Sequence, residues 1–311
     1  MSRSIGMIGF GEAGRTLAAV VVSSAAGLTV YDRAFTDPAR GEALRSAVAG
    51  LGARAARGPE ALAGCDVVLS LVTPATAVQA ATAYAPSARD GVLFIDLNST
   101  APRDKREIAA VLGRARVVDG VMTGGGIRLD GARIPISLAG PQAHEAGEIL
   151  VGLGLNAAVV GTEVGAAAAL KMLRGVVIKG LEALYVEAML AADELGLVEP
   201  LLTNIEETLD RWPARDFAAM LVTTHVAHAG RRRIEAGMVR DTVAGAGVEP
   251  TMASATAARL GRTAEGLREL GRSPGDVPAT LAEALAVLRQ LPPPPGAGSP
   301  EPDVTPTGGT R

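Results

Sequence analysis

The chain has 311 residues, of which 48% are hydrophobic, 20% are charged and only 3% are aromatic. This composition is globular and argues against wholesale disorder, and the length favours two domains over one. A formal net charge of −3 argues against a protein that coats a nucleic-acid polyanion. The single cysteine, Cys65, rules out an internal disulfide and a multi-cysteine zinc site, so we expect a cytoplasmic protein.

Short apolar runs alternate with Ala/Leu-rich helical stretches throughout the first half of the chain. This alternation predicts a parallel sheet that is covered by helices on both faces, as in a Rossmann-type, doubly wound α/β domain. We place that domain over residues 1–162, with its first helix over residues 13–22. The expected strands are residues 5–9, 28–32, 66–71, 91–96, 116–119, 134–139 and 156–160.

A different pattern follows the expected sheet. Apolar residues recur at intervals of three or four over residues 165–195, which predicts one long helix. Thr162 can cap the start of this helix and Gly196 its end. Further helical periods follow, so we expect an all-helical domain over residues 163–291, entered through the long helix. Residues 292–311 are rich in Pro and Gly and predict a disordered tail.

Neither a membrane-spanning segment nor a signal peptide is expected. The longest uncharged run, residues 67–88, is interrupted by polar residues and prolines, and is typical of a buried strand, a loop and a short helix. Near the N-terminus, Glu12 and a glycine-rich turn interrupt the apolar stretch too early for a signal peptide.

A Gly-x-Gly-x-x-Gly motif lies directly after the first expected strand and opens the first helix. In this pattern the first glycine makes a tight turn, the second lets the backbone approach a pyrophosphate, and the third lets helix and strand pack closely. The N-terminus of the helix adds a positive dipole toward the phosphates. The dinucleotide-binding residues predicted here are Gly9, Phe10, Gly11, Glu12, Ala13 and Gly14.

Asp32 ends the second expected strand, 18 residues after Gly14, where a carboxylate can hold the ribose hydroxyls of adenosine. A carboxylate at this position repels a 2′-phosphate and so favours NAD. Arg33 can instead pair with that phosphate, which keeps NADP possible, or it can be a solvated surface charge. We therefore expect NAD as the cofactor, with NADP as the alternative.

Residues 5–195 resemble the β-hydroxyacid dehydrogenase and 6-phosphogluconate dehydrogenase-like superfamily, because five of its motifs occur here in the same order as in the family. The glycine turn is the first. Residues 70–74 resemble the family's loop over the cofactor, and residues 96–100, followed by a proline, resemble its segment beside the nicotinamide. Residues 119–125 resemble its substrate-binding segment. Lys171 matches the lysine that serves the family as acid/base.

The resemblance implies that the cofactor is contacted by Leu71, Val72, Thr73, Pro74, Asn98 and Ser99, and the substrate by Thr123, Gly124 and Gly125. It also implies hydride transfer between the nicotinamide and a small anionic hydroxy compound, with Lys171 exchanging the hydroxyl proton. Two rival functions remain open: an imine reductase-like enzyme and a catalytically silent dinucleotide-binding sensor. The resemblance further implies a homodimer, and the C-terminal pattern resembles a less characterised branch with its own short helical domain.

The position of Lys171 on the expected helix also supports a role as acid/base. It lies early on the long helix between the apolar positions Leu170 and Leu173, so its stem is partly buried. Desolvation lowers the pKa of a lysine and lets it take a proton from an alcohol near neutral pH. The alternative is a lysine at the flank of the helix whose amine reaches water.

The chain departs from the family pattern directly after Lys171. Where the family has two asparagines, this chain has Arg174 and Gly175, and Thr123 replaces the family's serine. Arg174 is one helical turn from Lys171 and carries a fork suited to a carboxylate or phosphate, while Gly175 leaves room. We therefore expect a substrate that is bulkier or more highly charged than a simple hydroxyacid. Alternatively, Arg174 points to solvent.

Other candidate residues carry weaker signals. His225 and His228 stand three residues apart, as metal ligands can, but no carboxylate or cysteine completes a recognisable set, so we expect no metal. Lys179 is interpreted as a surface charge, with contact to an anionic substrate as the alternative, and Arg231 as part of a solvated or subunit-facing run of charges. The predicted partners are thus a small-molecule substrate and a second copy of the chain, with neither nucleic acid nor membrane.

Overall fold

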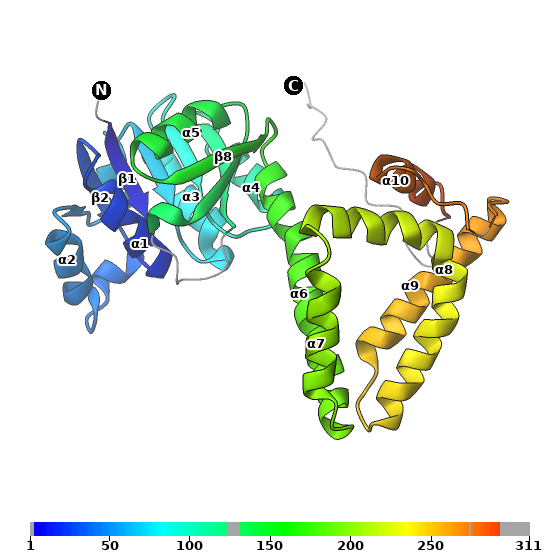
Figure 1. Cartoon of the computed structure of the whole chain (residues 1–311). Coiled ribbons are helices and arrows are strands. Elements are labelled where there is room, and N and C mark those ends of the chain that lie inside the picture. The colour runs from blue at the N-terminus through cyan, green and yellow to red at the C-terminus, as the bar shows by residue number, and fades with distance from the viewer. Residues whose placement is uncertain (1–2, 124–130, 274, 293–311) are drawn as a thin grey trace. The chain divides into compact units, whose positions relative to one another are not determined.

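The computed structural model describes residues 3–123, 131–273 and 275–292 (Figure 1). The chain divides into two compact units, residues 1–177 and 178–311, and the division falls inside the long helix α6, Ala166–Glu194. The sequence places the boundary ahead of that helix. The expected disordered tail lies outside the described residues except for Pro292. Within the described ranges, no helix is both long enough and apolar enough to cross a membrane.

One sheet forms the centre of the first unit. In the described part of the chain it has eight strands in the order β3-β2-β1-β4-β5-β6-β7-β8, so the chain runs outward from β1 through β2 and β3 and then crosses back to β4. This reversal beside β1 is the order of a doubly wound dinucleotide-binding sheet and confirms the predicted fold. The strands are β1 Ser4–Ile8, β2 Gly27–Tyr31, β3 Arg54–Ala55, β4 Val67–Ser70, β5 Leu93–Asp96, β6 Arg116–Met122, β7 Pro135–Ala139 and β8 Asn156–Gly161.

One pair of strands corrects the expectation of an all-parallel sheet. All strand pairs are parallel except β6 and β7, where Val121 lies opposite Ser137 in an antiparallel ladder. Twelve positions separate Met122, the last residue of β6, from Pro135, the first residue of β7. This is the lower limit of the dozen or more residues that a crossover between parallel strands needs. The chain then returns to parallel pairing between β7 and β8, which are joined through a helix.

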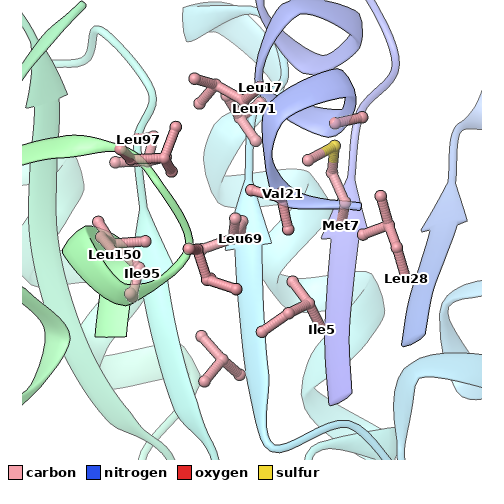
Figure 2. Close-up of a cluster of buried hydrophobic side chains, with 14 of the residues drawn as sticks. Ile5, Met7, Leu17, Val21, Leu28, Leu69, Leu71, Ile95, Leu97 and Leu150 are labelled. Carbon is pink, nitrogen blue, oxygen red and sulfur yellow. The ribbon is translucent and has the colours of Figure 1, made fainter. Parts of the chain in front are cut away.

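Helices cover both faces of the sheet, which explains why the central strands β1, β4 and β5 are mostly apolar and buried. In β4, Val67 and Leu69 belong to one core and Val68 to the core on the other face. Figure 2 shows the first core, where side chains of the central strands meet Leu17 of α1 and Leu150 of α5. The helices of this unit, apart from α6, are α1 Glu12–Val21, α2 Gly41–Gly50, α3 Ala77–Tyr84, α4 Pro102–Val111 and α5 Ala143–Gly152.

The sequence suggests that Thr162 caps the start of α6, but in the structure a residue of a distant strand caps it. Asp119 in β6 uses its Oδ2 to accept the backbone N–H groups of Gly165 and Ala168, each at 3.0 Å. A buried carboxylate satisfies these free N–H groups and meets the positive end of the helix dipole, so a local hydroxyl is not needed. The other end of the helix is as predicted, because Gly196 has a φ of +69°.

The second unit is helical throughout its described residues, as predicted. It contains the last turns of α6 together with α7 Val198–Leu209, α8 Ala214–Gly245, α9 Thr251–Glu269 and α10 Leu281–Arg289. Glu187 of α6 accepts the backbone N–H groups of Met252 at 2.6 Å and Ala253 at 2.9 Å, and so caps the first turn of α9. Two small apolar clusters join α8 to α9 and α10.

Candidate functional site

The glycine motif forms the turn between β1 and α1, next to the end of β4. Gly9 has a φ of +101°, and a Cβ at this position would lie 2.2 Å from the carbonyl oxygen of Leu71, so only glycine allows the turn. A Cβ on Gly14 would lie 2.4 Å from the carbonyl oxygen of Gly9, so this glycine lets α1 pack on the turn. Both glycines therefore do what the sequence motif predicts.

Gly11 has a different environment. It is exposed at the N-cap of α1, and no heavy atom of the described structure lies within 4 Å of the position that a Cβ would take. An open helix N-terminus of this kind fits a pyrophosphate, because free N–H groups and the helix dipole both favour negative charge there. Phe10 contributes only its backbone, since its ring is buried against Phe35. Glu12 is exposed and Ala13 packs against the core.

Asp32 is in direct contact with the glycine turn. Its Oδ2 accepts the backbone N–H of Phe10 at 2.7 Å, and its Oδ1 accepts that of Ala34 at 2.8 Å, at the start of the short helix η1, Arg33–Thr36. The carboxylate is half-buried, and each of its oxygens keeps a second lone pair for a ribose hydroxyl. Arg33 is exposed beside it.

Asn98 connects the loops that follow β4 and β5. Its Oδ1 accepts the backbone N–H of Val72 at 2.6 Å, and its Nδ2 donates to Ser70 Oγ at 2.9 Å and to the Asp96 carboxylate. These internal partners leave the backbone as the part of Asn98 that a cofactor could contact. Leu71 is buried, whereas Thr73 and Pro74 are exposed at the same edge of the sheet.

Lys171 lies in the first turns of α6, and its Nζ donates a hydrogen bond to Ser99 Oγ. The structure thus brings together two predicted site residues that are 72 positions apart. Burial lowers the pKa of Lys171, and the positive charges of Lys105 and Arg174 lower it further. A lysine with a lowered pKa releases its proton more readily, as a general acid/base near neutral pH must.

The predicted substrate residues are described only in part. Thr123 follows β6, and both its backbone N–H and its hydroxyl donate to the carbonyl oxygen of Pro135, at 2.8 Å and 3.2 Å. Gly124 and Gly125 lie outside the described residues. Arg174 is exposed, and its charge acts on Lys171, which places the two cations in the same neighbourhood.

A buried ionic cluster around Lys105 was not predicted from the sequence. The Lys105 side chain on α4 is 1% exposed, and its ammonium lies 2.8 Å from Asp96 Oδ2 and 3.3 Å from Asp119 Oδ1. Burial raises the pKa of Asp96, against the opposing effect of Lys105. Lys105 stands in a charged stretch that is typical of an exposed helix. The available signal is its spacing from Ile108 and Leu112, which places it on the apolar face of α4.

The candidates in the second unit do not form a recognisable metal site. His225 Nε2 lies 2.9 Å from Thr263 Oγ1, and burial, with Arg259 and Arg232 nearby, lowers the pKa of this histidine. Among the described residues, no group of three or more His, Cys, Asp or Glu side chains is placed to hold a metal ion. Lys179 is exposed. Arg231 pairs with Glu235 at 3.7 Å, as expected of a surface charge.

Two family models match the chain. Residues 4–161 match the model described as the NAD binding domain of 6-phosphogluconate dehydrogenase. Residues 192–263 match a domain of unknown function, DUF1932. The first match covers the whole sheet and the glycine turn, and the second lies within the helical unit.

Solved structures of similar proteins cover nearly the whole chain. A conserved hypothetical protein from Sinorhizobium meliloti is 33% identical, with a TM-score of 0.61 over 94% of this chain and 97% of that one. A conserved protein of unknown function, reported to be structurally similar to 3-hydroxyacid dehydrogenases, is 31% identical, with a TM-score of 0.58 over 84% of this chain and 98% of that one. An imine reductase from Pseudomonas sp. shares the fold, at 18% identity and a TM-score of 0.66 over 93% of this chain and 100% of that one.

Proposed function

This chain belongs to the family that carries the NAD-binding domain of 6-phosphogluconate dehydrogenase, and from that premise we propose that it is an NAD(P)-dependent dehydrogenase acting on the CH–OH group of a small anionic compound. The observation that carries the proposal is the half-buried Lys171, which is hydrogen-bonded to Ser99 in the segment that follows β5. The nicotinamide, when bound, supplies or accepts the hydride. The likeness to 3-hydroxyacid dehydrogenases, reported for one relative, supports the hydroxyacid class.

The residues of the chain supply binding and proton transfer. The glycine turn and the N-terminus of α1 hold the pyrophosphate, and Asp32 holds the adenosine ribose. Lys171 takes the hydroxyl proton of the substrate during oxidation and returns a proton during reduction. Its hydrogen bond to Ser99 Oγ fixes the direction in which the amine points. Arg174 and Thr123 hold the anionic group of the substrate.

The substitution Lys171→Met tests this assignment. We expect turnover to fall by roughly 10²–10⁴, which is the usual contribution of a positioned general base, in a screen of small hydroxyacids and the corresponding carbonyl compounds. NAD affinity should stay nearly unchanged, because the glycine turn lies on other elements. Lys179→Met removes an exposed lysine from the same helix and is the matched control. Near-normal turnover of the Lys171→Met variant would remove Lys171 from the mechanism.

Imine reduction is the alternative, because an imine reductase shares the fold over nearly the whole chain. A screen of cyclic imines with NADPH distinguishes it from alcohol oxidation. A silent sensor would bind NAD and turn over neither class of substrate. Lys171 favours the dehydrogenase, since a half-buried amine with a lowered pKa suits proton exchange with a hydroxyl group.

We also propose that the enzyme is a homodimer that forms through α6. Eleven large apolar side chains between Leu170 and Leu195 are exposed, and Leu173 and Val176 reach 67% and 71% exposure. Monomeric proteins seldom expose so many large apolar side chains along one helix. Light scattering should give a molar mass of about twice the 31.5 kDa of one chain. The Val176→Glu variant should have the molar mass of the monomer. A wild-type monomer at working concentration would contradict this.

A further inference from the structure

The ammonium of Lys105 contacts two neighbouring strands at once. It donates to the backbone carbonyl oxygens of Asp96 at 2.8 Å and Gly120 at 2.9 Å. The carboxylates of Asp96 and Asp119 lie 2.8 Å and 3.3 Å away. An ammonium has three protons to donate, so these four oxygens satisfy it fully within the protein. Asp96 Oδ2 and Asp119 Oδ1 make ion pairs with this ammonium but have no hydrogen-bond partner among the described residues, so the ammonium is their counter-charge in the interior.

One branch of this network leads to Lys171. Asp119 Oδ1 faces Lys105, while its Oδ2 accepts the backbone N–H groups of Gly165 and Ala168. Lys171 follows Ala168 by three residues, within one turn of the capped end of α6. The position of the amine therefore depends on a carboxylate that Lys105 holds.

The other branch leads to Ser99. One oxygen of Asp96 contacts Lys105, and the other accepts a hydrogen bond from the side chain of Asn98. Asn98 directly precedes Ser99 and is tied to the end of β4 through Val72. Lys105 thus contacts the residues that hold the start of α6 and the segment after β5. These two segments carry Lys171 and Ser99, which form the hydrogen bond.

We propose that Lys105 is a positioning residue for Lys171: through Asp96 and Asp119 it holds both partners of the Lys171–Ser99 pair, and it adds a positive charge in their neighbourhood. This inference rests on the proposed role of Lys171 as the acid/base. Because Lys105 is enclosed in the interior, it acts through the groups that it anchors and through its charge.

The charges around Lys171 come from three sides. α4 contributes Lys105, α6 itself contributes Arg174, and the strands contribute Asp96 and Asp119. Both carboxylates already face Lys105, and Asp119 also caps α6. The two nearby cations disfavour a proton on Lys171 and act in the same direction as burial, which lowers the pKa of this lysine.

The choice of residue type supports a specific role. The chain has 27 arginines and only three lysines, Lys105, Lys171 and Lys179. A guanidinium is a broad planar fork, whereas an ammonium is a compact charge that four oxygens can surround. In a chain that otherwise uses arginine for nearly every cation, a lysine at this enclosed position indicates that the ammonium geometry is needed.

The same composition makes the test direct. In the full chain labelled with ¹³C-lysine and saturated with NAD, three lysines give three Cε signals, which Lys171→Met and Lys179→Met assign. We expect the Lys171 signal to titrate below 10.5. In a double variant, Lys105→Met with Asp96→Asn, one cation leaves together with the carboxylate that it neutralises. The Lys171 midpoint should then shift by about 0.5 pH units or more, because Lys171 and Ser99 lose the group that holds them in place.

Arg116→Met is the matched control for simple loss of stability. It breaks the Arg116–Glu145 ion pair on the same sheet and should leave the Lys171 midpoint unchanged. An unchanged midpoint in the folded double variant overturns the proposal. Failure of the proposed function would show separately, as a Lys171→Met variant that keeps its turnover.

Discussion

The backbone N–H of Phe10 donates to Asp32 Oδ2 at 2.7 Å, across 22 positions of the sequence. This bond joins the glycine turn after β1 to the end of β2, so the residue expected to hold the ribose also shapes the loop expected to hold the pyrophosphate. The two halves of the dinucleotide site therefore depend on one another. A substitution at Asp32 should affect both.

We predict that Asp32→Ala weakens NAD binding by about tenfold to a hundredfold, the usual effect of losing a hydrogen bond to a charged group. The affinity for NADP should fall less than the affinity for NAD, because the variant has no carboxylate to repel the 2′-phosphate. The preference for NAD over NADP should therefore become smaller. Calorimetric titration with both cofactors measures this. Asp66→Ala is the control, since Asp66 also accepts a backbone N–H, from Ser4 at 2.9 Å, but at the opposite ends of the strands. Tighter binding of NADP by the wild-type protein would instead favour Arg33 as the determinant.

The lowered pKa of Lys171 has a consequence for stability. At pH values between the pKa of Lys171 in the folded chain and its ordinary value of 10.5, the unfolded chain binds more protons than the folded chain. Lys171 therefore destabilises the fold at neutral pH, and this cost disappears as the pH rises toward 10.5. We expect Lys171→Met to be more stable than wild type at pH 7, with a difference that narrows at alkaline pH. Urea unfolding at a series of pH values tests this, with Lys179→Met as the control.

A second stability prediction concerns Tyr84 on α3. Its ring stacks on Phe94 with centroids 5.8 Å apart, and its buried hydroxyl has no hydrogen-bond partner among the described residues. We expect Tyr84→Phe to keep the stacking and to stabilise the protein by about 1 kcal/mol, because an unsatisfied polar group leaves the core.

The pH dependence of the same residue gives an independent check. Burial raises the pKa of Tyr84 to about 12, so the wild type should lose stability as the pH rises from 10 toward 12, when the unfolded chain ionises first. The Tyr84→Phe variant should lack this part of the loss. Equal alkaline loss in both proteins, or a less stable variant, would mean that the hydroxyl has a favourable partner.

Local patterns were enough to predict the parts of the site that depend on local geometry. Gly9 needs a positive φ and Gly14 a close contact with the turn, so both leave a clear mark in the sequence. The long helix was equally visible, because its period and the terminal Gly196 are local signals.

The contacts that depend on distant elements could not be read in this way. Asp119 caps α6 across 46 positions, and a local hydroxyl such as Thr162 is the only capping candidate that the sequence reveals. Lys105 stands among exposed charges, and its acceptors in β5 and β6 become neighbours only when the strands pair.

The last prediction concerns Arg174, which distinguishes this chain from the pattern of the superfamily. Arg174 is exposed one turn after Lys171, and its charge helps to lower the pKa of that lysine. Because we propose that its guanidinium binds the anionic group of the substrate, we expect Arg174→Gln to raise KM about tenfold or more and to leave NAD binding unchanged. Arg174→Lys should recover only part of the loss, because an ammonium keeps the charge but not the fork. Lys179→Gln removes another exposed cation of α6 and is the control. An unchanged KM would assign Arg174 to the surface and leave anion binding to the segment of Thr123.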